Sequence, residues 1–286
     1  MEGLIRFAAP GDTPALKALW QQAFDDTPEG TLFYFARRHK PENTLLYARG
    51  DEPLAMLTML PITLDFAGRQ LPGRYLFAVA TREDARGRGL STQLLEAAHR
   101  HMEGQGVAAS VLAPAQASLF AFYEKRGYQT HFYADTITVP AGDIPPYAGQ
   151  ARELTAQDYL ALRDSAFSAS SLFVRWDEAA LQYVLASTRL YGGLGLYAQD
   201  GDTRGCALCE PLEDGRVRVT DMALEGMMPL HLLAALHQRL NARAYELRVG
   251  EGLWPGARRQ PLGMLCPLRP LPDTQGAPPY LALIKD

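Results

Sequence analysis

The chain has 286 residues and a formal net charge of −4, with 47% of its residues hydrophobic and 21% charged. A chain of this size buries a core without disulfide or metal support, in one large domain or two modest ones. The acidic balance, which is spread over both halves, argues against a nucleic-acid partner, because such a protein needs a basic surface.

The first half of the chain predicts alternating strands and helices. A short strand ending near Phe7 leads through a polar turn into an amphipathic helix with Leu16, Leu19 and Trp20 on its apolar face. A hairpin follows at the turn Gly50–Asp51. The hydrophobic periodicity predicts strands at 44–49, 54–65, 74–80, 107–112 and 128–139, and helices from 89 to 104 and at 116–126.

The stretch 140–149 holds three prolines and two glycines, which predicts a linker. Beyond it the pattern predicts helices near 156–166, 176–187 and 229–240, and strands at 194–198, 205–211, 216–223, 245–249 and 280–284. The segment 251–279 holds seven prolines and is expected to wrap the surface. The fold class is therefore mixed α/β or α+β.

A weak internal repeat supports a division at the linker. The run from Arg6 to Asp12 precedes the first helix, and the run from Arg152 to Asp158 precedes a second helix in the same way. We therefore expect a first domain over 1–139, a linker over 140–150 and a second domain over 151–286.

No apolar run approaches the roughly 18 residues of a membrane-spanning helix. The start of the chain, with acidic Glu2 and a lone Arg6, does not resemble a signal peptide. Its three cysteines are an odd number in a long chain, which fits a reducing compartment. We expect a cytoplasmic protein without a membrane partner.

The most informative stretch is 78–91, where a buried strand leads through a polar turn onto a helix. The first N–H groups of a helix have no intrahelical acceptors, and with the helix dipole they form a site for a phosphate. Gly87 and Gly89 let the backbone approach phosphate oxygens closely. A Rossmann fingerprint fails because position 92 is Thr, and a P-loop fails because Leu90 and Ser91 follow Gly89.

The turn Arg86-Gly87-Arg88-Gly89-Leu90, with the strand before it and the run Phe120 to Tyr128 after it, closely resembles the GNAT superfamily of acyl-CoA-dependent N-acyltransferases. The resemblance covers about 3–138 well and the second half in outline. It implies tandem GNAT-like domains, each a central mixed, mostly antiparallel sheet flanked by helices. The second half has no turn of this kind, so it is expected to have lost the cofactor and to form one wall of the acceptor site.

The resemblance also implies which residues bind acetyl-CoA as co-substrate. Backbone groups of Ala78, Val79 and Ala80 would pair with the pantetheine arm, and Ser118 would contact the cofactor. The pyrophosphate would be held by N–H groups of the turn, which comprises Arg86, Gly87, Arg88, Gly89, Leu90 and Ser91. Asp84 stands where the family often has Gln or Arg, and little loss of binding is expected because the contacts are mainly backbone.

The resemblance places Tyr123 at the general-acid position. A phenol with a pKa of about 10 is protonated at neutral pH and can donate to the departing CoA thiolate. No acidic residue on 75–80 offers a general base, so either a water chain or a distant carboxylate serves. In Eis-like tandem enzymes, which this chain resembles, the C-terminal carboxylate enters the active site, and Asp286 is the corresponding candidate.

The leading hypothesis is an N-acetyltransferase that needs no metal and acts by direct attack of a primary amine, in a small molecule or a peptide. A non-catalytic acyl-CoA-binding or sensor protein is the alternative, motivated by the missing base. The net charge of −4 slightly favours cationic acceptors. Candidate acceptor walls are aromatic: Trp20, Phe24, Phe33, Tyr34, Phe173 and Trp176. His99 and His101, two apart on a helix, are expected to be solvated.

Overall fold

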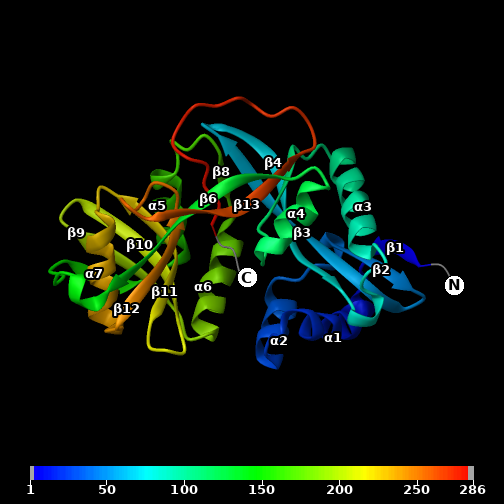
Figure 1. Cartoon of the computed structure of the whole chain (residues 1–286), viewed down its shortest axis with the longest axis horizontal. Helices are drawn as coiled ribbons and strands as arrows, with labels where there is room; N and C mark the ends of the chain where they lie inside the picture. Colours follow the sequence, from blue (N-terminus) through cyan, green and yellow to red (C-terminus); the bar gives the residue numbers. More distant parts are fainter. Residues whose placement is uncertain (1–2, 283–286) are drawn as a thin grey trace.

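The computed structural model describes residues 3–282. One mixed sheet of 13 strands runs through this part of the chain and joins its two halves (Figure 1). Its order is β1-β2-β3-β4-β5-β13-β6-β12-β11-β10-β9-β7, and β8 pairs with β3 off this path. Most ladders are antiparallel, and the parallel ones join β4 to β5 and β11 to β12. The predicted class, a mixed and mostly antiparallel sheet flanked by helices, is confirmed.

The first half holds ten helices and strands of the described chain. In order they are β1 (Leu4–Phe7), α1 (Thr13–Phe24), α2 (Pro28–Arg37), β2 (Thr44–Arg49), β3 (Glu52–Phe66), β4 (Arg69–Thr81), α3 (Leu90–Gly104), β5 (Ala109–Leu112), α4 (Ala117–Glu124) and β6 (Gln129–Pro140). β4 begins five residues before its predicted start, because Ala67 and Gly68, both with positive φ, close a tight hairpin with β3.

The second half follows the same outline. Its elements are β7 (Gln150–Glu153), α5 (Ala156–Ala166), β8 (Phe173–Arg175), α6 (Glu178–Leu190), β9 (Leu194–Asp200), β10 (Thr203–Pro211), β11 (Val217–Glu225), α7 (Pro229–Leu240), β12 (Ala244–Gly250) and β13 (Arg258–Pro267). Ion pairs mark the repeat, since Arg6 binds Asp12 at 2.6 Å and Arg152 binds Asp158 at 2.8 Å. Each pair ties the first strand of its half to the start of the next helix.

The two halves exchange strands at the centre of the sheet, where β6 and β13 cross the molecule (Figure 1). β13 comes from the second half but lies between β5 and β6, and β6 in turn pairs with β12. The expectation that 251–279 only wraps the surface is therefore wrong for Arg258–Pro267. The predicted strand at 280–284 is reduced, among the described residues, to a bridge between Tyr280 and Phe173.

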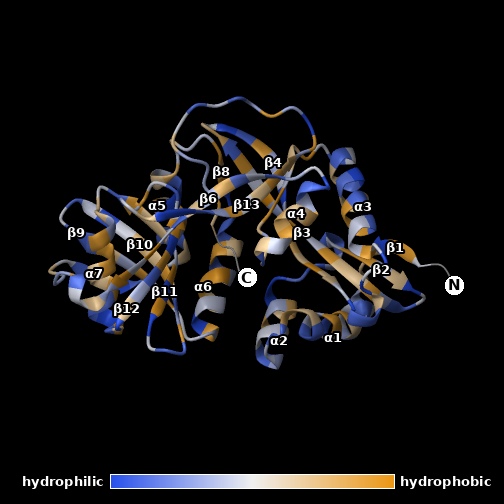
Figure 2. Ribbon diagram, in the orientation of Figure 1, coloured by the Kyte–Doolittle hydropathy of each residue, from blue (hydrophilic) through white to orange (hydrophobic). Residues whose placement is uncertain are grey.

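Helices cover both faces of the first half's strands. Leu57 and Met59 of β3 face a core shared with α3 and Tyr123 of α4, whereas Met56 faces a core shared with α1 and α2. A larger core joins the ends of β3 and β4 to α5 and α6 of the second half. Hydrophilic residues dominate the turns at the outer edges (Figure 2). Within residues 3–282, no helix has both the length and the apolar character needed to cross a membrane.

Candidate active site

β4 and β5 part after a short parallel ladder. Gly73 to Tyr75 pair with Ala109 to Val111, and β4 then continues to Thr81 with no further β5 partner among the described residues. Along residues 76–81 the edge of β4 on the β5 side therefore has no paired strand among the described residues, which leaves a gap in the strand pairing. Backbone N–H and C=O groups along such a gap can bind an extended ligand as a further strand would.

A β-bulge lies in the diverging part of β4. Phe77 pairs with Thr58 and Ala80 with Met56, so Ala78 and Val79 together face Leu57. Ala78 has a φ of 53°, which is uncommon for a residue with a Cβ. A bulge turns peptide groups out of the ladder, and such bulges recur next to active sites. Of the three residues predicted to hold the pantetheine arm, Ala78 and Val79 thus form the bulge and Ala80 directly follows it.

The predicted phosphate turn reaches the start of α3 with an open backbone. Gly87 and Gly89 have φ values of 77° and 74°, and a Cβ added at either would meet nothing within 4 Å. Gly89 is the N-cap of α3 and supplies no side-chain hydrogen bond, so the first N–H groups of this 15-residue helix lack a side-chain acceptor there. This geometry leaves room for an anion beside the helix N-terminus.

Two arginines flank the turn without carboxylate partners in the described chain. Arg86 donates to the carbonyl oxygen of Thr81 at 3.3 Å, and Arg88 donates to that of Asp84 at 2.8 Å. Arg82, in contrast, binds both Asp84 and Glu52. The Arg82 guanidinium lowers the pKa of Asp84 by hydrogen bonding to its carboxylate, so the negative charge that departs from the family pattern is held by a neighbouring cation.

Tyr123 is buried in the core between α3 and the sheet. Its ring meets that of Tyr128 at 5.6 Å, and burial raises the pKa of its hydroxyl to about 12. The Tyr123 hydroxyl is therefore protonated at neutral pH.

Further predicted site residues are two serines and Asp286. Ser118 is exposed on the first turn of α4, and the Ser91 hydroxyl is 2.7 Å from that of Thr81. Asp286, the candidate base, lies outside the described residues.

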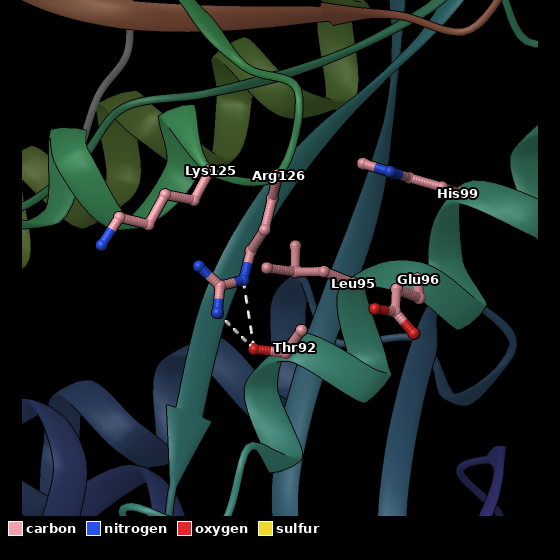
Figure 3. A pocket seen from close by; sticks show the side chains of 6 residues that line it. All are labelled: Thr92, Leu95, Glu96, His99, Lys125 and Arg126. Carbon is pink, nitrogen blue, oxygen red and sulfur yellow. Dashed lines mark hydrogen bonds between the residues drawn. The ribbon is translucent and has the colours of Figure 1, made fainter.

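A cavity of about 230 Å³ between α3 and the end of α4 was not predicted (Figure 3). It is lined by Thr92, Leu95, Glu96, His99, Lys125 and Arg126. Arg126 donates from Nε to the Thr92 hydroxyl at 3.1 Å and covers the Phe122 ring. Part of the cavity lining was recognisable in the sequence, because Thr92, Glu96 and His99 recur at helical spacing along one face of α3.

His99 also corrects an expectation. Its Nε2 lies 2.9 Å from the Tyr128 hydroxyl, which in turn lies 2.6 Å from that of Ser110, and burial lowers the pKa of His99. It is half-buried rather than solvated, because its ring lies against that of Tyr128 just before β6.

The aromatic residues named as acceptor walls separate into three groups. Trp20 and Tyr34 stack at 4.1 Å inside the core, and Phe173 is 2% exposed in another core. Phe24 is 41% exposed on the surface. Phe33 and Trp176 lie at the junction of the two halves, where Phe33 stacks on Tyr183 and Trp176 meets Tyr75 edge-on at 5.3 Å.

Comparison with known proteins agrees with this geometry. Residues 4–131 match the family described as acetyltransferase (GNAT) domain. A comparison with curated proteins finds no match.

Solved structures share the fold over nearly the whole chain. A GCN5-related N-acetyltransferase from Anabaena variabilis has a TM-score of 0.75 at 17% identity, over 94% of this chain and 73% of the other. One from Kribbella flavida has a TM-score of 0.71 at 19% identity, over 93% and 72%. Eis1 from Mycobacterium abscessus has a TM-score of 0.68 at 13% identity, over 93% and 74%. Residues 4–131 thus match a GNAT acetyltransferase domain, the chain is an acyltransferase, and its fold is similar to that of Eis1.

Proposed function

We propose that the protein transfers the acetyl group of acetyl-CoA to a primary amine. The observation that carries this proposal is the divergence of β4 from β5 immediately before an open helix N-terminus. A gap with free backbone groups suits the amide-bearing pantetheine arm, and the helix N-terminus suits the pyrophosphate. Acetyl is the proposed acyl group, and the acceptor is a small molecule or peptide.

The proposed co-substrate site follows the chain from β4 to α4. Backbone groups of Ala78, Val79 and Ala80 bind the pantetheine arm, and N–H groups from Arg86 to Ser91 bind the pyrophosphate. Ser118, exposed at the start of α4, is the proposed further contact with acetyl-CoA. Lys125 and Arg126, which line the cavity beside α3, add positive charge for the nucleotide end of the molecule.

The proposed reaction is direct attack by the neutral amine. The amine nitrogen forms a bond to the thioester carbonyl carbon, the carbon–sulfur bond breaks, and the sulfur leaves with the bonding electrons. Tyr123 gives its proton to the thiolate, the nitrogen loses one proton to a base, and solvent restores the phenol. The products are the N-acetylated amine and CoA. Asp286 remains the proposed base, either directly or through water.

We also propose the division into a catalytic domain over 1–139, a linker over 140–150 and a degenerate GNAT-like domain over 151–286. The paired ion pairs and the repeated strand order support two such units. A cytoplasmic location is proposed as well, because the three cysteines are free and buried.

The experiment is a paired measurement of binding and turnover. Acetyl-CoA binding is followed by titration calorimetry, and CoA release is followed across a panel of primary amines. Binding with transfer to at least one amine is the expected result. Binding without transfer to any amine would instead favour the non-catalytic acyl-CoA sensor, and stronger transfer from butyryl-CoA or myristoyl-CoA would correct the acyl group.

A further inference from the structure

An arginine without a counterion lies at the junction of the two halves. Arg38 directly follows α2 and is half-buried, with its guanidinium carbon 5.8 Å from the Trp176 ring centre and 6.0 Å from that of Tyr183. No carboxylate of residues 3–282 lies within ion-pair distance of it, and burial lowers its pKa. Asp177 is the acidic residue that influences it, but that carboxylate caps α6 by accepting the Ala180 N–H at 2.7 Å.

A second donor beside Arg38 also lacks an acceptor. Trp176 is 6% exposed, and its Nε1 has no hydrogen-bond partner among the described residues. The indole of Trp20 shows the usual arrangement, because its Nε1 donates to Asp26 at 2.9 Å. Buried donors in folded proteins are nearly always satisfied, so an orphaned one points to an absent ligand or water. An unpartnered indole N–H beside a guanidinium that has no ion pair within residues 3–282 favours an anion.

These donors lie next to the proposed acetyl site. Trp176 contacts Tyr75, the last β4 residue that pairs with β5. Tyr183 and Phe77 both pack against the core that β4 shares with α1 and α2, across the strand from α3. An acyl group threaded between β4 and β5 from the α3 side would therefore emerge toward Arg38 and Trp176.

We propose that Arg38 and the Trp176 indole bind a carboxylate of the acceptor, so that the acceptor is an amine carrying a carboxylate, such as an amino acid or the C-terminal end of a peptide. The proposal rests on the acetyltransferase function proposed above. A guanidinium presents two parallel N–H groups that match a carboxylate, and the indole N–H adds a further donor. The local positive charge thus outweighs the slight preference for cationic acceptors expected from the net charge of −4.

The test uses acceptor pairs that differ only in carboxylate versus carboxamide, namely amino acids and short peptides with free or amidated C-termini. We expect kcat/KM to favour the carboxylate form by roughly 10-fold to 100-fold, the worth of a charge-assisted hydrogen bond. Arg38→Gln should bring that ratio near one and leave KM for acetyl-CoA unchanged. Trp176→Phe, which keeps the ring and removes the N–H, should reduce the ratio less. Arg37→Gln is the matched control, because Arg37 is exposed and adjacent.

A measurement without turnover separates this inference from the proposed function. N-acetylglycine and N-acetylglycinamide represent the two product types, and their binding is followed by calorimetry with the wild type and Arg38→Gln. Tighter binding of N-acetylglycine that Arg38→Gln removes would support the carboxylate site even if no tested amine were acetylated. Equal binding of both probes, or equal kcat/KM for both acceptor forms, would overturn it, whereas loss of acetyl-CoA binding alone would count against the function.

Discussion

In each half of the molecule two parallel strands part after a short ladder, and the halves differ in what lies beside the resulting gap. β11 and β12 are parallel only from Val217 to Val219, just as β4 and β5 are parallel over three residues. A register shift also interrupts the pairing of β11 with β10, as it does that of β4 with β3. In the first half the gap leads to an open glycine turn. In the second half it is filled.

The filling comes from the end of the described chain. Tyr280, Leu281 and Ala282 lie beside Thr220 and Asp221 of β11 and Val249 of β12, and a space of only about 10 Å³ remains. Tyr280 stacks on Phe167 and donates to Asp221, which also accepts from Tyr159. Arg163, 1% exposed, lies 3.6 Å from Asp221, which is 2% exposed. The topology creates the cleft, and side chains decide whether a ligand enters.

Removing the charge of Asp221 should have the largest effect. Asp221→Asn leaves Arg163 as a buried cation without its carboxylate, and the free energy of unfolding should fall by about 3–5 kcal/mol. Thermal and urea unfolding measure this. Glu225→Gln on the same strand is the control, because its pair with Arg204 is exposed and should change stability by less than about 1 kcal/mol. Equal losses in the two variants would mean that the buried pair is not specially important.

Gly89→Glu should weaken acetyl-CoA binding at the turn before α3 in the first half. The substitution forces a side chain into a φ of 74° and places a negative charge at the helix N-terminus, so acetyl-CoA should bind about 100-fold more weakly or worse. Gly215→Glu is a matched control, since Gly215 has a φ of 78° and equally open surroundings in the second half. Retained affinity in Gly89→Glu would contradict the phosphate-turn assignment.

Tyr123→Phe tests the chemistry of the first half. Loss of a general acid should lower kcat about 100-fold while KM for acetyl-CoA changes little. An acid acts in its protonated form, and burial raises the pKa of Tyr123 to about 12, so the hydroxyl stays protonated throughout pH 6–9. The ratio of wild-type to variant kcat should therefore be constant over that range. Unchanged turnover in the variant would refute the donor role.

Breaking either of the repeated ion pairs should have the smallest effect. The two losses of unfolding free energy then compare the first half with the second. Hydrogen bonding to Arg6 lowers the pKa of Asp12, and Asp12 is 7% exposed. Asp12→Asn should cost about 2 kcal/mol, and Asp158→Asn, whose partner Arg152 is half exposed, less than about 1 kcal/mol. Because the folded pKa is below the unfolded one, this stability exists above about pH 4 and disappears as pH falls through the folded pKa. Urea unfolding at pH 7 and pH 3 measures it, and a larger loss in Asp158→Asn would reverse the ranking.

Much of the fold was predictable because its signals are local. The helices Ala156–Ala166 and Pro229–Leu240 match their predicted ranges, since caps, prolines and apolar spacing define helix ends within one segment. The strand–turn–helix of the phosphate turn was predictable for the same reason. β13 was not predicted because Pro261 and Pro267 disfavour a strand. The structure accommodates Pro261 because the ladder between β13 and β6 is irregular there.

By itself the amino-acid sequence determined the class, the repeat, the superfamily resemblance and the turn from Arg86 to Ser91, because each depends on neighbouring residues. Only the tertiary structure decided the exchange of β6 and β13, the parting of β4 from β5, and the filling of the second cleft by Tyr280. It also decided that Arg38 and Trp176, far apart in the chain, lie together, with no carboxylate paired to Arg38 and no acceptor for the Trp176 indole within residues 3–282. These features depend on contacts between segments that are distant in the chain, and no local pattern encodes such contacts.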